Sequence, residues 1–171
     1  MATVVCSSRK GAVGADASLY TMPSFDEARF DYREVLDLDT FAMSARILSK
    51  LLPDFSEEEM TKLVHDGYAG KFETDHLTPT VPVGEDHILE LFRGPTSAFK
   101  DVALSMLPRL MTAAKGKCGF TDEIMILTAT SGDTGKAAME GFCNVPGTRI
   151  IVFYPYGGVS AVQQAQMATQ A

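Results

Sequence analysis

From Leu77 onward, apolar runs of strand length alternate with stretches of helical periodicity, and the connections between them are short. Strands that alternate with helices in this way form crossover units on a parallel sheet. The sequence therefore predicts an α/β fold for this half of the chain. The expected strands are 88–92, 124–129 and 149–154, and the expected helices are 98 or 99 to about 114, 136–142 and 159–170.

The part before Leu77 has a helical pattern instead. Apolar residues recur at helical spacing over 41–52, and Ser56 with Glu59 forms the capping-box pattern at the start of a second helix. Neither helix carries a cluster of reactive side chains. We therefore expect a small helical domain over 1–77, followed by a second domain over 78–171.

Composition excludes several classes of function. The chain has 171 residues, 46% apolar and 22% charged, which is typical of a globular protein. Its net charge of −7 argues against nucleic acid or an anionic membrane as the main partner. Cys6, Cys118 and Cys143 are widely spaced and odd in number, which predicts neither a disulfide framework nor a zinc site and favours a cytoplasmic setting.

Lys100 stands after a Gly-Pro turn, where an apolar helix is expected to begin. The positive end of the helix dipole disfavours a cation at that place, which suggests that the amine is held neutral. A neutral, partly desolvated amine is what a Schiff base with a carbonyl cofactor needs. The alternative interpretation is an exposed lysine paired with Asp101.

The segment from Thr128 to Gly135 places hydroxyl groups and glycines between a strand and a helix. Glycines allow close approach of the backbone to a ligand, and free N–H groups at a helix start can bind a carboxylate or phosphate. The alternative is an ordinary turn whose Ser, Asp and Thr cap the helix. The P-loop pattern fails because its first glycine would fall at Thr130, and the Rossmann glycine pattern is absent.

An amine and an anion-binding turn on successive crossover units are together what an amino-acid enzyme with pyridoxal phosphate requires. The two segments resemble threonine synthase in sequence: Glu90–Asp101 is similar to that family's cofactor-lysine segment, and Leu127–Gly135 to its substrate-carboxylate loop. Similarity to the family also extends to 152–155, 159–160 and 163–170, to 56–72 and, near the start, to 7–11, 19–20 and 22–23.

The resemblance implies a fold-type-II enzyme with a mainly parallel sheet, which converts O-phosphohomoserine and water to threonine and phosphate through a Schiff base. It implies that Lys100 binds pyridoxal 5′-phosphate and shuttles protons, with Phe99 beside the cofactor ring. The residues implied to contact the substrate carboxylate are Thr130, Ser131, Asp133 and Thr134, of which Asp133 can instead face the cofactor's 3′-oxygen.

Two positions depart from the family pattern. Related enzymes often have Asn in place of Asp133, and an ionised carboxylate only accepts hydrogen bonds, whereas an amide also donates them. Arg93 stands where the family commonly has His, and it cannot serve as a base at neutral pH.

The family is also several hundred residues long. Its phosphate-binding loop and its partner for the pyridine nitrogen are expected beyond Ala171, so we expect this chain alone to bind the cofactor poorly and to be inactive. Two alternatives stay open, a phospho-lyase that gives 2-oxobutyrate from the same substrate and a non-catalytic module of this fold. The sequence does not predict an oligomeric state.

Overall fold

The structure, a computed structural model, describes residues 5–6, 20–21 and 26–170 of the chain. By its internal contacts the chain forms two units, unit 1 over 1–62 and unit 2 over 63–171. The domain boundary predicted at residue 77 stays a prediction. Most of the opening segment that resembles the threonine synthase family lies outside the described residues.

Unit 1 is mainly helical. Asp39 caps its long helix α1 by accepting a hydrogen bond from the backbone N–H of Ala42 at 2.8 Å. Arg46 of this helix bridges Glu57 at 2.7 Å and Glu34 at 3.3 Å, and these carboxylates raise the pKa of its guanidinium. The elements are the antiparallel pair β1 (Val5–Cys6) and β2 (Tyr20–Thr21), the 3₁₀ turns η1 (Asp26–Ala28) and η2 (Tyr32–Val35), and α1 (Thr40–Leu51).

Helix α2 (Glu57–Tyr68) begins with the predicted capping box, which is confirmed. The Ser56 N–H donates to the Glu59 carboxylate at 2.8 Å, and the Glu59 N–H donates to the Ser56 hydroxyl at 3.2 Å. Two helix-start N–H groups are thereby satisfied within four residues. The boundary between the two units falls within α2, after Lys62.

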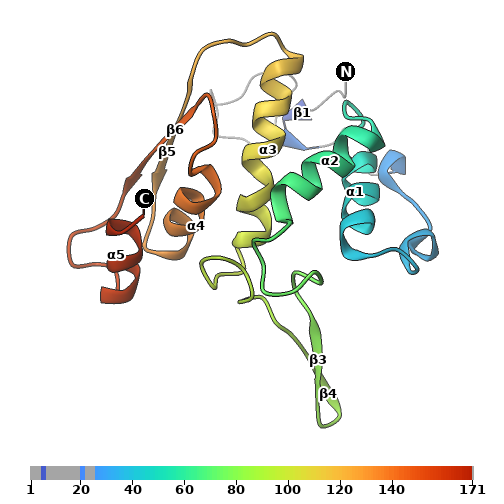
Figure 1. Cartoon of the computed structure of the whole chain (residues 1–171), viewed down its shortest axis with the longest axis horizontal. Coiled ribbons are helices and arrows are strands. Elements are labelled where there is room, and N and C mark those ends of the chain that lie inside the picture. The colour runs from blue at the N-terminus through green and yellow to red at the C-terminus, as the bar shows by residue number, and fades with distance from the viewer. Residues whose placement is uncertain (1–4, 7–19, 22–25, 171) are drawn as a thin grey trace. The chain divides into compact units, whose positions relative to one another are not determined.

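After the rest of α2, unit 2 has a hairpin that differs from the prediction. Strand β3 (Thr80–Val83) pairs antiparallel with β4 (Asp86–Leu89), and Gly84 at φ 63° lies in the turn between them. The strand expected over 88–92 thus ends early and belongs to a separate two-stranded sheet. A turn this short can join only antiparallel neighbours, since parallel strands need a long crossover. Figure 1 shows this hairpin extending away from the helices of unit 2.

The rest of unit 2 follows the predicted alternation of helix and strand. Strands β5 (Ile124–Ala129) and β6 (Thr148–Phe153) are parallel, which confirms the predicted sheet type. Helix α5 begins with a capping box between Ser160 and Gln163. The helices are α3 (Asp101–Lys117), α4 (Asp133–Phe142) and α5 (Ala161–Ala168), and α4 packs on α3, β6 and α5.

Helix α3 continues through Pro108, which is fully buried. Proline has no N–H, so the carbonyl of Leu104 loses its usual donor one turn along the helix. Gly141 of α4 lies against this carbonyl: a Cβ at Gly141 would come within 2.0 Å of the Leu104 oxygen and 3.6 Å of Pro108 Cγ. The close packing of α3 on α4 therefore requires glycine at position 141.

We predict that Gly141→Ala destabilises the protein by about 1–3 kcal/mol, because the methyl group overlaps a backbone oxygen of α3 that cannot move alone. Urea unfolding followed by circular dichroism measures the change. Gly116→Ala is the matched control, since Gly116 also lies in a helix but has open space around it. That variant should gain up to about 1 kcal/mol, and equal stability of the two variants would contradict the packing described.

The buried side chain of Tyr68 gives a second testable prediction about the stability of unit 2. Its buried hydroxyl donates to the carbonyl of Val102 at 2.9 Å, and burial raises its pKa from 10.0 to about 12. A raised folded-state pKa means that the unfolded state ionises first as pH rises. The stabilisation is complete below pH 10 and is lost as pH approaches 12.

We therefore predict that the free energy of unfolding falls by about 2 kcal/mol between these two pH values because of Tyr68 alone. Tyr68→Phe should flatten this part of the pH profile, whereas Tyr156→Phe, which changes a fully exposed tyrosine, should leave it intact. Identical alkaline profiles for wild type and Tyr68→Phe would refute the assignment.

Candidate functional site

The loop that carries Lys100 is anchored at its start by Arg93. Its guanidinium contacts the carboxylates of Glu73 at 2.6 Å and Glu90 at 2.7 Å, and these hydrogen bonds raise its pKa, with Glu73 as the larger cause. The Arg93 carbonyl also accepts a hydrogen bond from the Glu73 N–H at 3.0 Å. Arg93 thus ties the loop to the segment that follows α2.

Asp101 organises the rest of the loop from inside. Its side chain is buried, and its two oxygens accept hydrogen bonds from the Thr96 hydroxyl at 2.6 Å and the Thr96 N–H at 2.8 Å. A longer bond of 3.4 Å comes from the Ala98 N–H. Asp101 therefore holds the Gly94–Lys100 loop as an acceptor at the start of α3, where the helix dipole also favours a negative charge.

The backbone of this loop fits closely around that carboxylate. A Cβ at Gly94 would lie 2.5 Å from both Cβ and Oδ2 of Asp101, so only glycine fits there. Ser97 adopts a left-handed conformation with φ 57°, which is uncommon for a residue other than glycine. The sequence Gly-Pro-Thr-Ser thus builds a compact loop around Asp101.

Lys100 is the residue immediately before α3. Its side chain is partly exposed, and Nζ lies 4.3 Å from the centroid of the Phe99 ring. Among the described residues, no hydrogen bond or ion pair engages its amine. The ion pair with Asp101 that the alternative interpretation includes is not formed, because the Asp101 carboxylate accepts hydrogen bonds from the loop, and the site role of Lys100 stays a prediction.

In the second loop, the Thr130 side chain forms hydrogen bonds within the loop itself. Its hydroxyl oxygen accepts hydrogen bonds from the N–H groups of Gly132 and Gly135, both at 3.0 Å, and donates to the Gly132 carbonyl at 3.2 Å. A Cβ at Gly135 would lie 2.3 Å from the Thr130 methyl group. The hydrogen bonds of the Thr130 hydroxyl thus stay within the loop. They hold the loop against the first turn of α4.

Asp133 is the first residue of α4 and is exposed. Its Oδ1 accepts a hydrogen bond at 2.8 Å from Gln163 of α5, which also forms the capping box of that helix. Gly132, at φ 149°, leaves room for the Gln163 side chain. Ser131 and Thr134 are both exposed, and the structure records no hydrogen bond of their hydroxyls to other described residues.

Both loops lead into helices of unit 2. Figure 1 shows the amino-terminal ends of α3 and α4 at one end of this unit, where β5 also ends. No hydrogen bond or ion pair joins the two loops within the described part of the chain. The arrangement offers a free amine on one loop and free hydroxyl groups at the start of a helix on the other, which suits a carbonyl compound and an anion respectively.

Asp101 and Gln163 were not predicted as site residues. In the sequence, Asp101 directly follows Lys100, a pattern typical of a surface ion pair. Gln163 stands three residues after Ser160, a pattern that indicates only a helix cap. The Thr96 hydroxyl, five residues before Asp101, was a weak signal for the buried contact.

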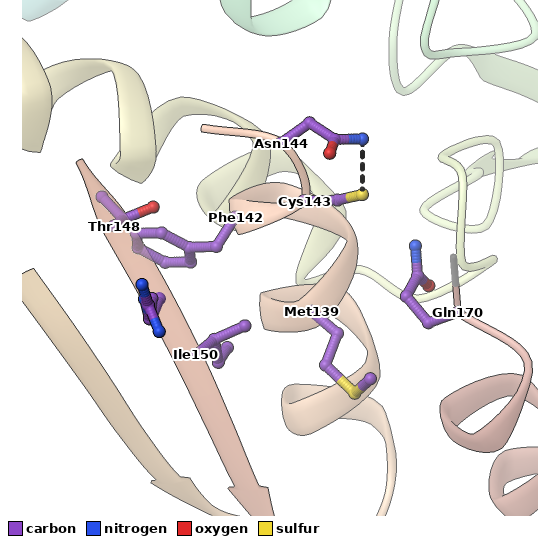
Figure 2. A pocket seen from close by; sticks show the side chains of 8 residues that line it. Met139, Phe142, Cys143, Asn144, Thr148, Ile150 and Gln170 are labelled. Carbon is purple, nitrogen blue, oxygen red and sulfur yellow. Dashed lines mark hydrogen bonds between the residues drawn. The ribbon is translucent and has the colours of Figure 1, made fainter. Parts of the chain in front are cut away.

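A pocket of about 360 Å³ lies elsewhere in unit 2, between the end of α4 and the start of β6. Figure 2 shows Phe142, Thr148 and Ile150 on its wall, with Gln170 at its border. Residues 148–150 begin their strand, so this pocket is at the opposite end of the sheet from the two loops. It includes none of the predicted site residues.

Across residues 26–170 and the two short N-terminal strands, no group of three or more His, Cys, Asp or Glu side chains is arranged to hold a metal ion. In that same part of the chain, no helix is both long and apolar enough to cross a membrane.

Comparison with known proteins gives one consistent result, although no protein-family model matches the chain. The threonine synthase of Pseudomonas aeruginosa is 33% identical over 162 residues, which is 92% of this chain and 34% of that protein. The threonine synthase of Escherichia coli is 34% identical over 152 residues, covering 88% of this chain and 33% of its own length.

Solved structures agree with the sequence matches. A yeast threonine synthase superposes with a TM-score of 0.78 at 30% identity, and a pyridoxal-phosphate-bound threonine synthase from Brucella melitensis with a TM-score of 0.75 at 34% identity. Each match covers 90% of this chain and 33% of the solved one. The chain is therefore a homologue of the threonine synthases over most of its own length, and it spans about a third of the length of the relatives it matches.

Proposed function

We propose that this chain provides the lysine and the substrate-carboxylate loop of a pyridoxal-phosphate-dependent lyase, and specifically of a threonine synthase. The observation that supports this most is Lys100: its partly exposed amine has no polar partner among the described residues, and its loop is fixed by the buried Asp101. Homology to threonine synthases over most of the chain supports the same reaction.

The residues present fit the reactive side of pyridoxal phosphate. Lys100 offers an amine for the aldehyde, and the neighbouring Phe99 ring, 58% exposed, offers an apolar surface for a planar ring. When bound, the cofactor withdraws electrons from the substrate and makes its carbon–hydrogen bonds acidic. Lys100 would hold the aldehyde end of the cofactor, and its amine would be placed to accept and return protons at the substrate.

Ser131 and Thr134 are the donors that we assign to the substrate carboxylate. Their hydroxyls are exposed at the start of α4, where free N–H groups and the helix dipole also favour an anion. Thr130 acts indirectly, because its hydroxyl maintains the loop. Asp133 already accepts a hydrogen bond from Gln163, and an ionised carboxylate has no hydrogen to donate to another acceptor oxygen. Its contact with the substrate carboxylate or with the cofactor's 3′-oxygen therefore stays a prediction.

The reaction we propose is the conversion of O-phosphohomoserine and water to threonine and phosphate, in the cytoplasm. A phospho-lyase would use the same lysine and loop but would release 2-oxobutyrate. The product formed from O-phosphohomoserine by the active enzyme distinguishes the two.

We predict that pyridoxal phosphate, added in excess and reduced with borohydride, labels Lys100 in preference to the other lysines, because the exposed Phe99 ring beside its amine offers the cofactor ring an apolar surface. Peptide mapping by mass spectrometry locates the label. Lys100→Ala should remove this labelled peptide, whereas Lys115→Ala, a change at the far end of α3, should preserve it. Equal labelling of all exposed lysines would contradict the assignment, and this readout does not require turnover.

A second prediction concerns Asp101. Asp101→Ala leaves the buried donors of Thr96 without an acceptor and should destabilise the protein by about 2–3 kcal/mol. The same variant should slow the labelling of Lys100, since its loop is no longer fixed. Chemical denaturation and the labelling assay measure the two effects.

Asp101→Asn, which keeps one acceptor oxygen, should recover part of both losses. Asp122→Ala is the matched control because Asp122 is exposed. An Asp101→Ala protein with wild-type stability and labelling would show that the loop does not depend on this carboxylate.

A further inference from the structure

The side chain of Gln163 connects helix α5 to the first residue of α4. Its Nε2 donates to Asp133 Oδ1 at 2.8 Å, while its Oε1 accepts a hydrogen bond from the Ser160 N–H at 3.2 Å. The reverse orientation of the amide would place its oxygen against a carboxylate and its NH₂ group against an N–H donor. The two contacts therefore fix which end of the amide faces Asp133.

Gly132 leaves the space that this contact needs. It is buried just before α4, and a Cβ there would lie 2.3 Å from Nε2 and 2.6 Å from Oε1 of Gln163. A side chain at position 132 would thus displace the amide from the loop. The glycine of the loop and the glutamine of α5 fit each other, although they belong to successive crossover units.

Capping of α5 does not by itself require glutamine at position 163. A capping box accepts glutamate as readily as glutamine at this position, and the helix dipole favours a negative charge there. The first turn of α5 nevertheless has no acidic residue. A glutamate at this position would bring a second carboxylate against Asp133, and like charges at that distance repel each other. The neutral amide is the group that can both cap α5 and hold Asp133.

The Asp133 carboxylate, held in this way, does not occupy the start of its own helix. An acidic side chain in a first turn is ordinarily attracted to the free N–H groups there. Within the described part of the chain, the Asp133 side chain instead accepts its hydrogen bond from α5, and no N–H of α4 donates to it. The hydroxyls of Ser131 and Thr134 and the first-turn N–H groups thereby stay open to an external anion.

We propose that Gln163 is a positioning residue of the candidate site: it holds the Asp133 carboxylate toward α5 and so prevents it from competing with a substrate carboxylate at the start of α4. This role rests on the proposed function, which assigns the loop to an amino-acid substrate. It gives α5, which carries none of the predicted site residues, a part in the site.

Nuclear magnetic resonance of the chain without ligand tests the positioning itself. In Gln163→Ala the Asp133 carboxylate is released, and the backbone amide signal of Thr134 should shift as the carboxylate turns toward the start of α4. In Asp133→Ala/Gln163→Ala this signal should return to its position in Asp133→Ala, because no carboxylate is left to move. Gln164→Ala, the same change at an exposed neighbour in α5, is the matched control and should leave the signal in place.

O-phosphohomoserine is the probe for binding, which the amide shifts of Ser131 and Thr134 report. Gln163→Ala should raise the dissociation constant about fivefold, because the released carboxylate repels that of the substrate. Asp133→Ala/Gln163→Ala should bind as Asp133→Ala does, since the loss acts through Asp133. Gln163→Glu keeps a capping group but adds a charge, so it should bind at least as weakly as Gln163→Ala. A purely structural role of the cap would let it bind as the wild type does.

Two results would overturn the positioning role. One is an unchanged Thr134 amide in ligand-free Gln163→Ala, and the other is a double variant that binds as weakly as Gln163→Ala although Asp133→Ala binds normally. A wild-type chain that does not bind O-phosphohomoserine would instead contradict the proposed function. The ligand-free measurement would then decide the role of Gln163 on its own.

Discussion

The pair of hydrogen bonds between the buried Asp101 carboxylate and Thr96 is the constraint on which the candidate site depends. It joins the first residue of α3 to a loop residue five positions earlier and satisfies two donors in a buried setting. A carboxylate is stable there because it accepts hydrogen bonds and stands at the positive end of a helix. Lys100 lies between these two anchors in sequence, so its position follows from theirs.

Glycine at a few positions lets neighbouring helices and loops pack closely against each other. Gly94 fits against Asp101, Gly135 against Thr130, and Gly141 against the carbonyl that Pro108 leaves without a donor. In each case a methyl group would overlap a neighbouring atom. These contacts connect the two loops to a common framework of α3, α4 and the parallel strands, and a rigid framework is what a binding site needs.

Much of the second half of the chain was predictable from local patterns. Strand β5 matches its prediction to the residue because the apolar residues 124–127 lead into the polar loop after Ala129. The α5 cap matches because Ser160 is a typical N-cap residue. The strand predicted over 88–92 is shifted toward the C-terminus relative to β4. Apolar residues continue to Phe92, but pairing with β3 ends near Glu90 because the hairpin sets the register.

The contacts within the site were less predictable. Helix α4 begins three residues before its predicted start because the Thr130 hydroxyl closes the loop onto the helix. Burial of Asp101 and the reach of Gln163 to Asp133 depend on tertiary packing, which no local pattern records. The family resemblance selected Lys100 as the candidate cofactor lysine, which stays a prediction, whereas the hydrogen bonds that keep the Asp101 carboxylate away from its amine are known only from the structure.

Hydrogen exchange at the Thr96 amide tests the central claim most directly. Thr96 lies in a loop without helix or strand pairing, so its N–H would exchange rapidly if the Asp101 carboxylate did not accept it. The structure predicts protection comparable to that of amides within α3. Exchange at the rate of an unstructured peptide would show that Asp101 does not hold the loop that carries Lys100.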